Sequence, residues 1–179
     1  MRIISGTYKG RHIHVPSGFR ARPTTDFARE GLFNILCHRL DLNGLRVLDL
    51  FGGTGSISLE FASRGASRID FVERDPASCA FMGKTSSSLG IQNIHIHRSD
   101  VFKFLDHSSL KFDLVFADPP YDLESIPDIP DRVFDNEIIV TKGLFILEHG
   151  KKHSFSAHSK FIEIRKYGSV HFSFFGKNQ

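Results

Sequence analysis

Short apolar runs alternate with helical patterns through most of the chain. The runs have the length and the aliphatic or β-branched character of buried strands, and the segments between them repeat apolar residues at helical spacing. The alternation predicts strands near 46–50, 68–73, 93–97, 112–117 and 143–148, and helices near 55–64, 76–89, 101–106 and 131–140. Strands that alternate with helices are typical of a parallel sheet covered on both faces. We therefore expect an α/β fold with a mostly parallel sheet.

The N-terminal part of the chain follows a different pattern. Two short strands, residues 2–5 and 11–15, flank a turn that contains glycine, which predicts a small β-hairpin. A linker punctuated by proline and glycine, residues 16–23, comes next. It leads to an amphipathic helix whose apolar positions begin at Phe27 and which ends near Arg39.

The C-terminal part returns to strand-like alternation. Residues 160–167 and 169–175 alternate around a glycine, which predicts a hairpin that closes the sheet with an antiparallel edge. We divide the chain into an N-terminal hairpin with its linker, residues 1–24, and a main domain, residues 25–179, within one compact unit. A length of 179 residues with 40% hydrophobic residues suits such a unit.

Composition excludes several classes of protein. The N-terminus lacks the apolar core of a signal peptide, and no run approaches the roughly 18 apolar residues that a membrane span needs. A soluble, cytoplasmic protein without a membrane partner is therefore expected, and we expect a monomer. The two cysteines, Cys37 and Cys79, lie far apart outside any C-x-x-C pair, so we expect buried free thiols rather than a disulfide or zinc site.

Basic residues gather at the two ends of the chain. Residues 1–30 hold six Lys and Arg against two Asp and Glu, and residues 151–179 hold six against one, whereas the stretch between them is acidic. If both ends lie beside the active-site mouth, they form a positive rim suited to a polyanion such as RNA. Solvated basic termini are an equally good interpretation of charge alone.

A glycine-rich turn follows the first predicted strand, from Asp49 to Gly55. Glycine lets a turn approach a bound nucleotide closely. The third glycine of the dinucleotide fingerprint is missing, because Ser58 stands in its place. The carboxylate of Asp49 would repel phosphates but suits a cationic or amino-bearing ligand. The turn therefore favours a sulfonium amino acid over NAD.

Two further acids stand at the ends of the next strands. Glu73 ends the second strand about twenty residues after the turn, where such folds place an acceptor for the ribose hydroxyls. Asp100 follows the third strand and suits a contact to an adenine amino group. Taken singly, each could be a helix cap or a solvated acid. Three acids at successive carboxyl ends favour a ligand site, since that edge is where open α/β sheets bind ligands.

The fourth strand runs into Asp118-Pro119-Pro120-Tyr121, the most specific motif of the chain. Two prolines fix an extended bend whose carbonyls can point outward as acceptors. An exocyclic amine on a base is a poor nucleophile, because its lone pair is delocalised into the ring. If Asp118 and the Pro119 carbonyl accept its two hydrogens, the nitrogen is biased toward pyramidal geometry, and Tyr121 could stack on the base. A proline-rich turn with a surface acid is the structural alternative.

The motif set as a whole resembles a known family. Asp49 to Gly55, Glu73, Asp100 and Asp118 to Tyr121 resemble the class I S-adenosylmethionine-dependent methyltransferases that act on amino nitrogens. Further segments are similar to the RsmD family, namely Arg2-Ile3-Ile4-Ser5-Gly6, Lys9-Gly10-Arg11, Arg22-Pro23-Thr24-Thr25-Asp26, Arg29-Glu30, Leu32-Phe33-Asn34-Ile35-Leu36 and Ser63-Arg64-Gly65-Ala66. That family methylates guanine N2 in bacterial small-subunit rRNA.

The resemblance implies a fold, a cofactor and a set of site residues. It implies a Rossmann-like, mostly parallel seven-stranded sheet with residues 25–179 as the methyltransferase domain, and S-adenosyl-L-methionine as cofactor. The implied cofactor contacts are Asp49, Phe51, Gly52, Gly53, Gly55, Glu73, Asp100 and Val101, and the implied catalytic residues are Asp118, Pro119, Pro120 and Tyr121. The residues expected to bind nucleic acid are Arg2, Lys9, Arg11, Arg22, Thr24 and Arg29. The expected partner is small-subunit (16S) rRNA or an assembling ribosomal subunit.

Two other functions stay open beside guanine-N2 methylation. One is methylation of adenine N6 in DNA or RNA, since the same motif works on either amine. The other is a catalytically idle RNA-binding factor in ribosome assembly. A glutamine methyltransferase is disfavoured, because those enzymes resemble this fold but have Asn in place of Asp118.

The ten histidines do not indicate a metal site, because nothing places a third ligand beside the alternating pairs His12 and His14 or His95 and His97.

Overall fold

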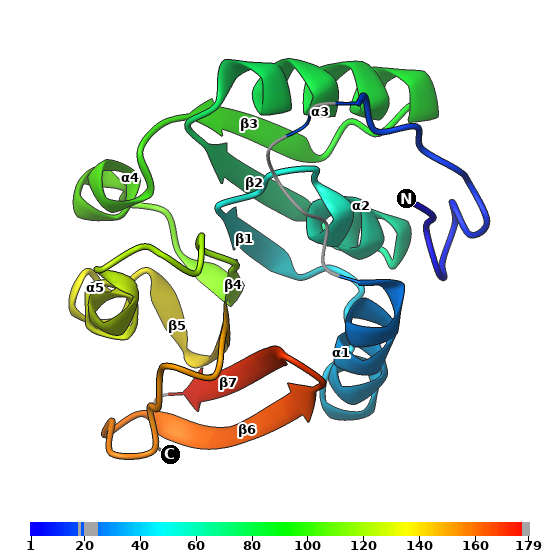
Figure 1. Cartoon of the computed structure of the whole chain (residues 1–179). Coiled ribbons are helices and arrows are strands. Elements are labelled where there is room, and N and C mark those ends of the chain that lie inside the picture. Colours follow the sequence, from blue (N-terminus) through cyan, green and yellow to red (C-terminus); the bar gives the residue numbers. More distant parts are fainter. Residues whose placement is uncertain (18, 20–24, 177–179) are drawn as a thin grey trace.

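A single mixed sheet organises the protein. The computed structural model describes residues 1–17, 19 and 25–176. Within these residues seven strands pair in the order β3-β2-β1-β4-β5-β7-β6 (Figure 1). They are β1 (Arg46–Leu50), β2 (Arg68–Glu73), β3 (Ile94–Arg98), β4 (Phe112–Ala117), β5 (Ile139–His149), β6 (Phe161–Tyr167) and β7 (Val170–Gly176). β1 to β5 pair in parallel, and β7 runs antiparallel to β5 and β6, which confirms a mostly parallel seven-stranded sheet with an antiparallel edge hairpin.

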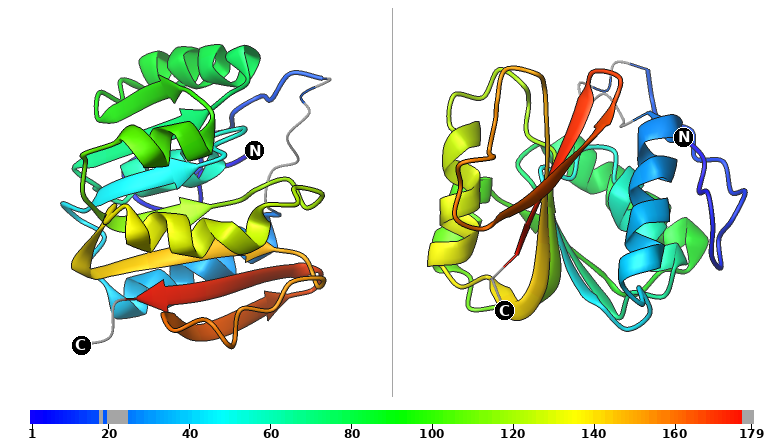
Figure 2. Two further views of the ribbon diagram at one scale, coloured as in Figure 1. Left: turned by 90° about the vertical axis from the view of Figure 1, so that its left-hand side faces the viewer. Right: turned by 90° about the horizontal axis from the view of Figure 1, so that it is seen from below.

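Helices cover both faces of the sheet (Figure 2). They are α1 (Asp26–Arg39), α2 (Ser56–Ser63), α3 (Pro76–Leu89), α4 (Val101–His107) and α5 (Ile129–Asp135), with a short 3₁₀ turn η1 (Ile126–Asp128). Buried residues of α1, α2 and α3 pack in one hydrophobic cluster, and those of α4 and α5 pack in a second. No helix in the described part of the chain is long and apolar enough to cross a membrane.

Strand alternation assigns each side chain to one of these clusters. In β4, Phe116 packs with the α1 side and Ala117 with the α4 side; in β5, Ile146 packs with the α1 side and Leu147 with the α4 side. Successive side chains of a strand point to opposite faces. Glu148, the residue after Leu147, therefore faces the α1 side of the sheet.

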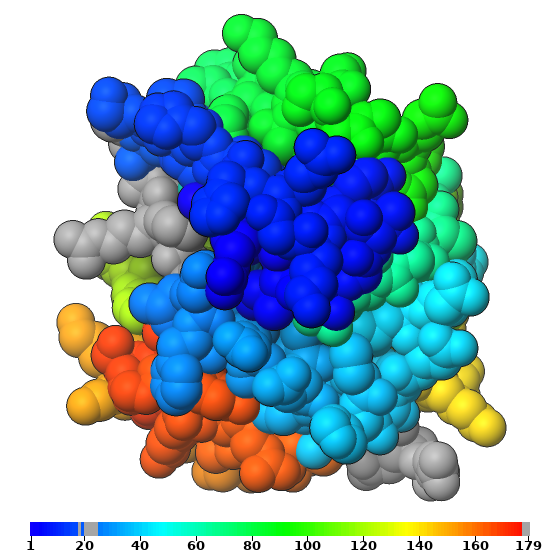
Figure 3. Space-filling view, turned by 90° about the vertical axis from the view of Figure 1, so that its right-hand side faces the viewer, coloured from blue at the N-terminus to red at the C-terminus, as the bar shows by residue number. Residues whose placement is uncertain are grey.

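The N-terminal hairpin is shorter than predicted. Its pairing reduces to one antiparallel bridge between Arg2 and His12, flanked by a 3.1 Å hydrogen bond from the Ile3 amide to the Arg11 carbonyl. The segment is held instead by packing, because Ile3 belongs to the core on the α1 side. The buried carboxylate of Glu60 in α2 accepts hydrogen bonds from the backbone amides of residues 4 and 5. Figure 3 shows this segment lying over the face of the molecule beside α1.

The largest error of the sequence prediction lies between α5 and β5. The expected helix over 131–140 is wrong in its second half, because α5 ends at Asp135 and β5 begins at Ile139. Glu137 takes a left-handed φ of 52°, which breaks the helix, and Ile139 then pairs with Phe112 of β4. The strand is consequently longer than the predicted 143–148.

Two further expectations about burial are wrong. Cys37 is exposed and Cys79 is only partly buried, although both thiols are free as expected. Phe27 is 72% exposed, although the apolar pattern predicts it on the buried side of the first helix. It stands in the first turn of α1, where its ring contacts only the edge of the sheet, at Tyr167 of β6.

Candidate active site

Three successive strand ends meet at one edge of the sheet. Leu50, the last residue of β1, pairs with Val72 of β2 on one side and with Ala117 of β4 on the other. The next residues along these strands therefore stand together: the glycine turn in the middle, with Glu73 and Asp118 on either side. This is the point where the strand order reverses, and open α/β sheets bind ligands there.

The glycine turn has a backbone that depends on its glycines. Gly53 and Gly55 take left-handed φ values of 53° and 74°, a region that costs other residues energy. Phe51, which is not glycine, also takes a positive φ of 61°. A Cβ on Gly52 would lie 2.1 Å from the ring of the buried Phe71 in β2. The turn is thus pressed against the sheet and keeps its amides close to any ligand above it.

Asp49 lies beneath this turn rather than on its surface. Its side chain is 2% exposed, and its carboxylate accepts a hydrogen bond from the Ser58 hydroxyl of α2. Burial raises the pKa of Asp49 to about 7, while the Ser58 hydrogen bond lowers it and the Glu73 carboxylate raises it further. Asp49 therefore joins the turn to the start of α2, and its predicted contact with the cofactor stays a prediction.

Glu73 connects the glycine turn to the turn that follows β2. Its Oε2 accepts a hydrogen bond of 3.0 Å from the Gly53 amide, and its Oε1 accepts one of 2.8 Å from the Asp75 amide. A carboxylate offers about four acceptor positions, so two are left for ribose hydroxyls. The structure fixes this carboxylate beside the turn, as a ribose ligand requires.

Asp100 and Val101 have clear structural roles. The Asp100 carboxylate caps α4 by accepting hydrogen bonds of 3.0 and 3.1 Å from the amides of Phe102 and Lys103. Val101 is buried in the core on the α4 side. The helix-cap interpretation of Asp100 is therefore confirmed. The adenine contact predicted for Asp100 and the cofactor contact predicted for Val101 stay predictions.

The tetrapeptide from Asp118 to Tyr121 leaves the sheet beside the glycine turn. The Asp118 amide donates to the Leu50 carbonyl of β1 at 3.3 Å, which ties the two segments together. Pro119 is buried and Pro120 is exposed. The Tyr121 ring is 43% exposed, and its hydroxyl donates to the Glu148 carboxylate at 3.2 Å.

Tyr121 remains a neutral hydrogen-bond donor at working pH. Its pKa is raised above the ordinary tyrosine value, first by burial and then by the nearby carboxylates of Glu148 and Asp118. The carboxylates of Glu148 and Asp118 are thus both close enough to this hydroxyl to affect its pKa. The Tyr121 hydroxyl therefore stands among acceptor groups.

Glu148 is a site residue that the sequence reasoning missed. It lies near the end of β5 on the α1 side of the sheet, is 3% exposed and holds the Tyr121 hydroxyl. A signal for it existed, because an acid at the carboxyl end of the fifth strand follows the same logic that singled out Glu73. A glycine follows soon after, Gly150, where a Cβ would lie 3.2 Å from the Tyr121 ring.

The residues expected to bind nucleic acid divide into three groups. Arg2, Lys9 and Arg11 are exposed and could meet a polyanion. Arg29 is 1% exposed and donates to the Arg2 carbonyl and to Asp26, so its side chain does not reach the surface and the prediction of a direct contact is wrong for it. Arg22 and Thr24 lie outside the described residues.

The two basic ends differ in their distance from this edge. The tip of the N-terminal hairpin contacts Ser63 at the last turn of α2, where the Tyr8 amide donates to the Ser63 hydroxyl. That end of α2 points away from the carboxyl edge, since α2 begins there at Ser56. Lys151 lies in the turn after β5, and Lys166 lies near the end of β6 beside β7, so these two basic residues stand at the carboxyl edge of the sheet.

Comparison with known proteins identifies the family. A family model described as Conserved hypothetical protein 95 matches residues 1–176. The chain is 32% identical over 148 residues to Ribosomal RNA small subunit methyltransferase D of Escherichia coli (strain K12), with 83% of this chain and 74% of that protein covered.

Solved structures agree with the fold. A hypothetical protein from Thermus thermophilus superposes with a TM-score of 0.87 at 26% identity, covering 98% of this chain and 99% of that chain. A T. thermophilus 16S rRNA N2 methyltransferase, RsmC, solved with AdoMet and guanosine, gives a TM-score of 0.71 at 23% identity, covering 92% of this chain and 46% of that one. The expected class I methyltransferase fold is confirmed, and the chain belongs to the Conserved hypothetical protein 95 family, the family of the RsmD methyltransferases.

Proposed function

We propose that this protein transfers a methyl group from S-adenosylmethionine to the exocyclic N2 of a guanine in small-subunit rRNA. The observation that carries the proposal is the juxtaposition of the glycine turn and the segment from Asp118 to Tyr121, tied by the hydrogen bond between the Asp118 amide and the Leu50 carbonyl. Family membership and the rRNA substrate named for the E. coli relative support the same activity.

The residues at the edge fit the cofactor. A side chain at position 52 would collide with the Phe71 ring, so glycine stands there. Without that side chain, a nucleoside can approach the backbone of the turn closely. The Glu73 carboxylate, held beside the turn, has acceptor positions left for ribose hydroxyls, and buried Asp49 would add negative charge near a cationic sulfonium once it ionises. When bound, the cofactor supplies an activated methyl group. No group of three or more metal-ligating side chains gathers among the described residues.

Asp118 and Pro119 prepare the amine for attack. The carboxylate and the carbonyl accept the two hydrogens of N2, which withdraws the nitrogen lone pair from the ring and directs it toward the methyl group. Positioning of the amine in line supplies much of the rate, since the sulfonium is already activated. The proton leaves N2 after attack, to Asp118 or to water, and no strong base is needed.

Guanine suits the acceptors beside Asp118 better than adenine does. The guanine edge carries a ring N1–H beside the N2 amine, whereas adenine carries an acceptor at N1 beside N6. The partly exposed carboxylate of Asp118 lies near the Tyr121 hydroxyl, and carboxylates accept from donors and repel acceptors. This arrangement favours the base with adjacent donors, which is guanine.

The test combines product mapping with one substitution. The purified protein is incubated with labelled S-adenosylmethionine and unmodified 16S rRNA, and the nucleosides of the product are identified by mass spectrometry; N2-methylguanosine is expected. Asp118→Ala should lower turnover about 10²-fold or more, because it removes an acceptor that acts on the reacting group. Its affinity for S-adenosylmethionine, measured by calorimetry, should stay within about twofold of the wild type, since this carboxylate lies outside the glycine turn.

A matched control and two opposing outcomes make the test decisive. Asp122→Ala removes an exposed carboxylate just after the tetrapeptide and should leave turnover unchanged. N6-methyladenosine as the product would assign the enzyme to the adenine class instead. Absence of S-adenosylmethionine binding by the wild-type protein would support an RNA-binding assembly factor.

A further inference from the structure

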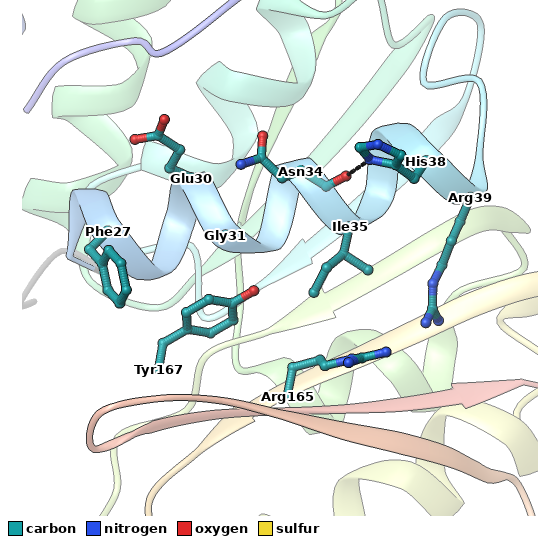
Figure 4. Close-up of a pocket in the computed structure, with 9 residues that line it drawn as sticks. All are labelled: Phe27, Glu30, Gly31, Asn34, Ile35, His38, Arg39, Arg165 and Tyr167. Atoms are coloured by element: carbon teal, nitrogen blue, oxygen red, sulfur yellow. Dashed lines mark hydrogen bonds between the residues drawn. The ribbon is translucent and has the colours of Figure 1, made fainter.

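An open groove runs between α1 and the edge strand β6, and neither the glycine turn nor the segment from Asp118 to Tyr121 lines it. It encloses about 750 Å³ and is lined by Phe27, Glu30, Gly31, Asn34, Ile35, His38, Arg39, Arg165 and Tyr167. Figure 4 shows α1 as one wall, with Phe27, Ile35 and Arg39 on its side toward β6 and the side chains of Arg165 and Tyr167 rising from β6 to face them. From Phe27 to Arg39 the helix wall is roughly 18 Å long, since each residue adds about 1.5 Å.

A chain of contacts joins one end of this groove to the candidate active site. Glu148, which holds the Tyr121 hydroxyl, pairs with Phe172 of β7. The Phe172 ring lies 5.9 Å from the Tyr167 ring, and the Tyr167 ring lies 5.7 Å from the Phe27 ring. The groove therefore starts at the edge of the sheet that holds Asp118 and leads away from it along α1.

The aromatic end of the groove is a platform for stacking. Phe27 is 72% exposed, and its ring meets the Tyr167 ring at 78°, so the Phe27 ring is supported by Tyr167 while most of it is open. Gly31 makes this possible, because a Cβ there would lie 2.2 Å from the Tyr167 ring. An exposed, supported aromatic ring binds an unstacked base regardless of its identity.

The other end of the groove carries cations. The guanidinium groups of Arg39 and Arg165 approach each other across the groove (Figure 4), and both bind the carboxylate of Glu163. The two guanidinium groups and the one carboxylate together carry a net charge of +1. Arg165 is 49% exposed, so its remaining donors can reach a phosphate.

An exposed aromatic ring at one end and arginines at the other fit a nucleic acid strand better than a partner helix. A groove that takes a partner helix presents a continuous apolar stripe. Here the apolar part of the groove is short, because Ile35 lies between the aromatic end and the arginines, and Glu30, Asn34 and His38 stand on the side of α1 away from β6 (Figure 4). A stacked base and a charged phosphate match the two ends of the groove.

We propose that the groove between α1 and β6 binds the single-stranded rRNA segment next to the target guanine, with a base stacked on Phe27 and a phosphate on Arg165. The inference rests on the proposed function and names a contact that fixes the RNA register at the catalytic edge. A base held by Phe27 would position the neighbouring nucleotides toward Asp118.

The test measures binding of naked 16S rRNA by filter retention at several salt concentrations. Phe27→Ala should raise the Kd about tenfold, because loss of one base–aromatic stack costs roughly 1–3 kcal/mol. Arg165→Ala should reduce the slope of log K against log salt by about 0.7, the value for one phosphate contact on a single strand. S-adenosylmethionine affinity should not change in either variant, which shows that the fold is intact.

Two substitutions of exposed residues outside the groove serve as controls. Lys84→Ala in α3 removes an exposed cation at the other end of the sheet, and Ile162→Ala removes a 51% exposed apolar side chain of β6 that does not line the groove. Both should bind 16S rRNA like the wild type. Equal loss in the controls would overturn the assignment to the groove.

The remaining outcomes separate this inference from the proposed function. Unchanged binding by Phe27→Ala and Arg165→Ala, while the wild type still forms N2-methylguanosine, would refute the groove alone. A defect seen only with ribosomal subunits, and not with naked rRNA, would assign the groove to a ribosomal protein and also overturn the inference. A wild-type protein that binds the RNA through this groove but forms no N2-methylguanosine would refute the proposed reaction instead.

Discussion

At the scale of single residues, burial decides what a charged side chain can do. Asp49, Arg29 and Glu148 are each at most 3% exposed, yet each has a different role. Asp49 supports the glycine turn through Ser58, Arg29 ties the N-terminal segment to α1, and Glu148 holds the Tyr121 hydroxyl. A charge out of water is retained only where partners compensate it.

Asp49 makes the stability of the protein depend on pH. Its pKa is about 7 in the folded state and about 3.8 in the unfolded chain, so the folded state holds a proton between these values that the unfolded chain releases. The associated stability is fully present below about pH 4 and is lost as pH rises through about 7. Asp49→Asn should abolish this loss, so its free energy of unfolding should gain on the wild type by up to about 4 kcal/mol between pH 4 and pH 7.

Urea denaturation at several pH values checks this prediction. Ser58→Ala serves as a companion variant, because it removes a hydrogen bond that favours the carboxylate and should move the loss of stability to higher pH. Parallel pH profiles for the wild type and Asp49→Asn would show that Asp49 titrates normally in the folded protein.

At the scale of elements, the turn between β1 and α2 is shaped by its neighbours. The Gly52 amide donates to the Val72 carbonyl at 3.0 Å, and the absence of a side chain lets the backbone lie against Phe71. The Phe71 ring is fully buried and cannot move aside. The tight turn therefore requires both the glycine that follows β1 and the aromatic ring in β2.

Gly52→Ala should destabilise the protein and weaken its cofactor affinity. Forcing a methyl group into this contact should cost about 1–3 kcal/mol in the free energy of unfolding. Gly83→Ala in α3 is the matched control, since its Cβ would lie 3.7 Å from Ile96, an ordinary contact. In a helix interior this control should gain about 0.5–1 kcal/mol. Denaturation and calorimetric titration measure both effects, and a neutral Gly52→Ala would contradict the tight packing of the turn.

At the scale of the whole molecule, the basic residues are not gathered around one mouth. Lys9 and Arg11 stand on the hairpin beside the last turn of α2, away from the carboxyl edge, whereas Lys151 and Lys166 border it. Electrostatic attraction to RNA acts over roughly 8 Å at physiological salt. The hairpin would therefore contact a part of the rRNA remote from the target base.

Charge reversal on the hairpin should weaken RNA binding without slowing the reaction at saturation. Lys9→Glu together with Arg11→Glu should flatten the dependence of log K on log salt by about 0.7–0.9 for each phosphate group that the protein no longer neutralises. Turnover at saturating rRNA should match the wild type, because the hairpin tip is remote from Asp118. An unchanged salt slope would place the RNA surface elsewhere, and Lys84→Glu on α3 is the matched control.

The sequence by itself determined the succession of most strands and helices along the chain and most residues of the candidate site. Periodic apolar residues define β1 to β4 and α1 to α4 within a residue or two, because local burial patterns and caps act over short distances. The acids at strand ends and the Asp118 to Tyr121 motif were readable for the same reason, since parallel strands bring their carboxyl ends to one edge.

Only the tertiary structure decided which of these groups are accessible and what lies between elements. The start of β5 depends on its pairing with β4, and the burial of Arg29 depends on the N-terminal segment that folds back over α1. The groove between α1 and β6 joins segments more than 120 residues apart, and no local pattern encodes it. Contacts of this kind join segments far apart in the chain, so they depend on the packing of the whole sheet rather than on local propensity.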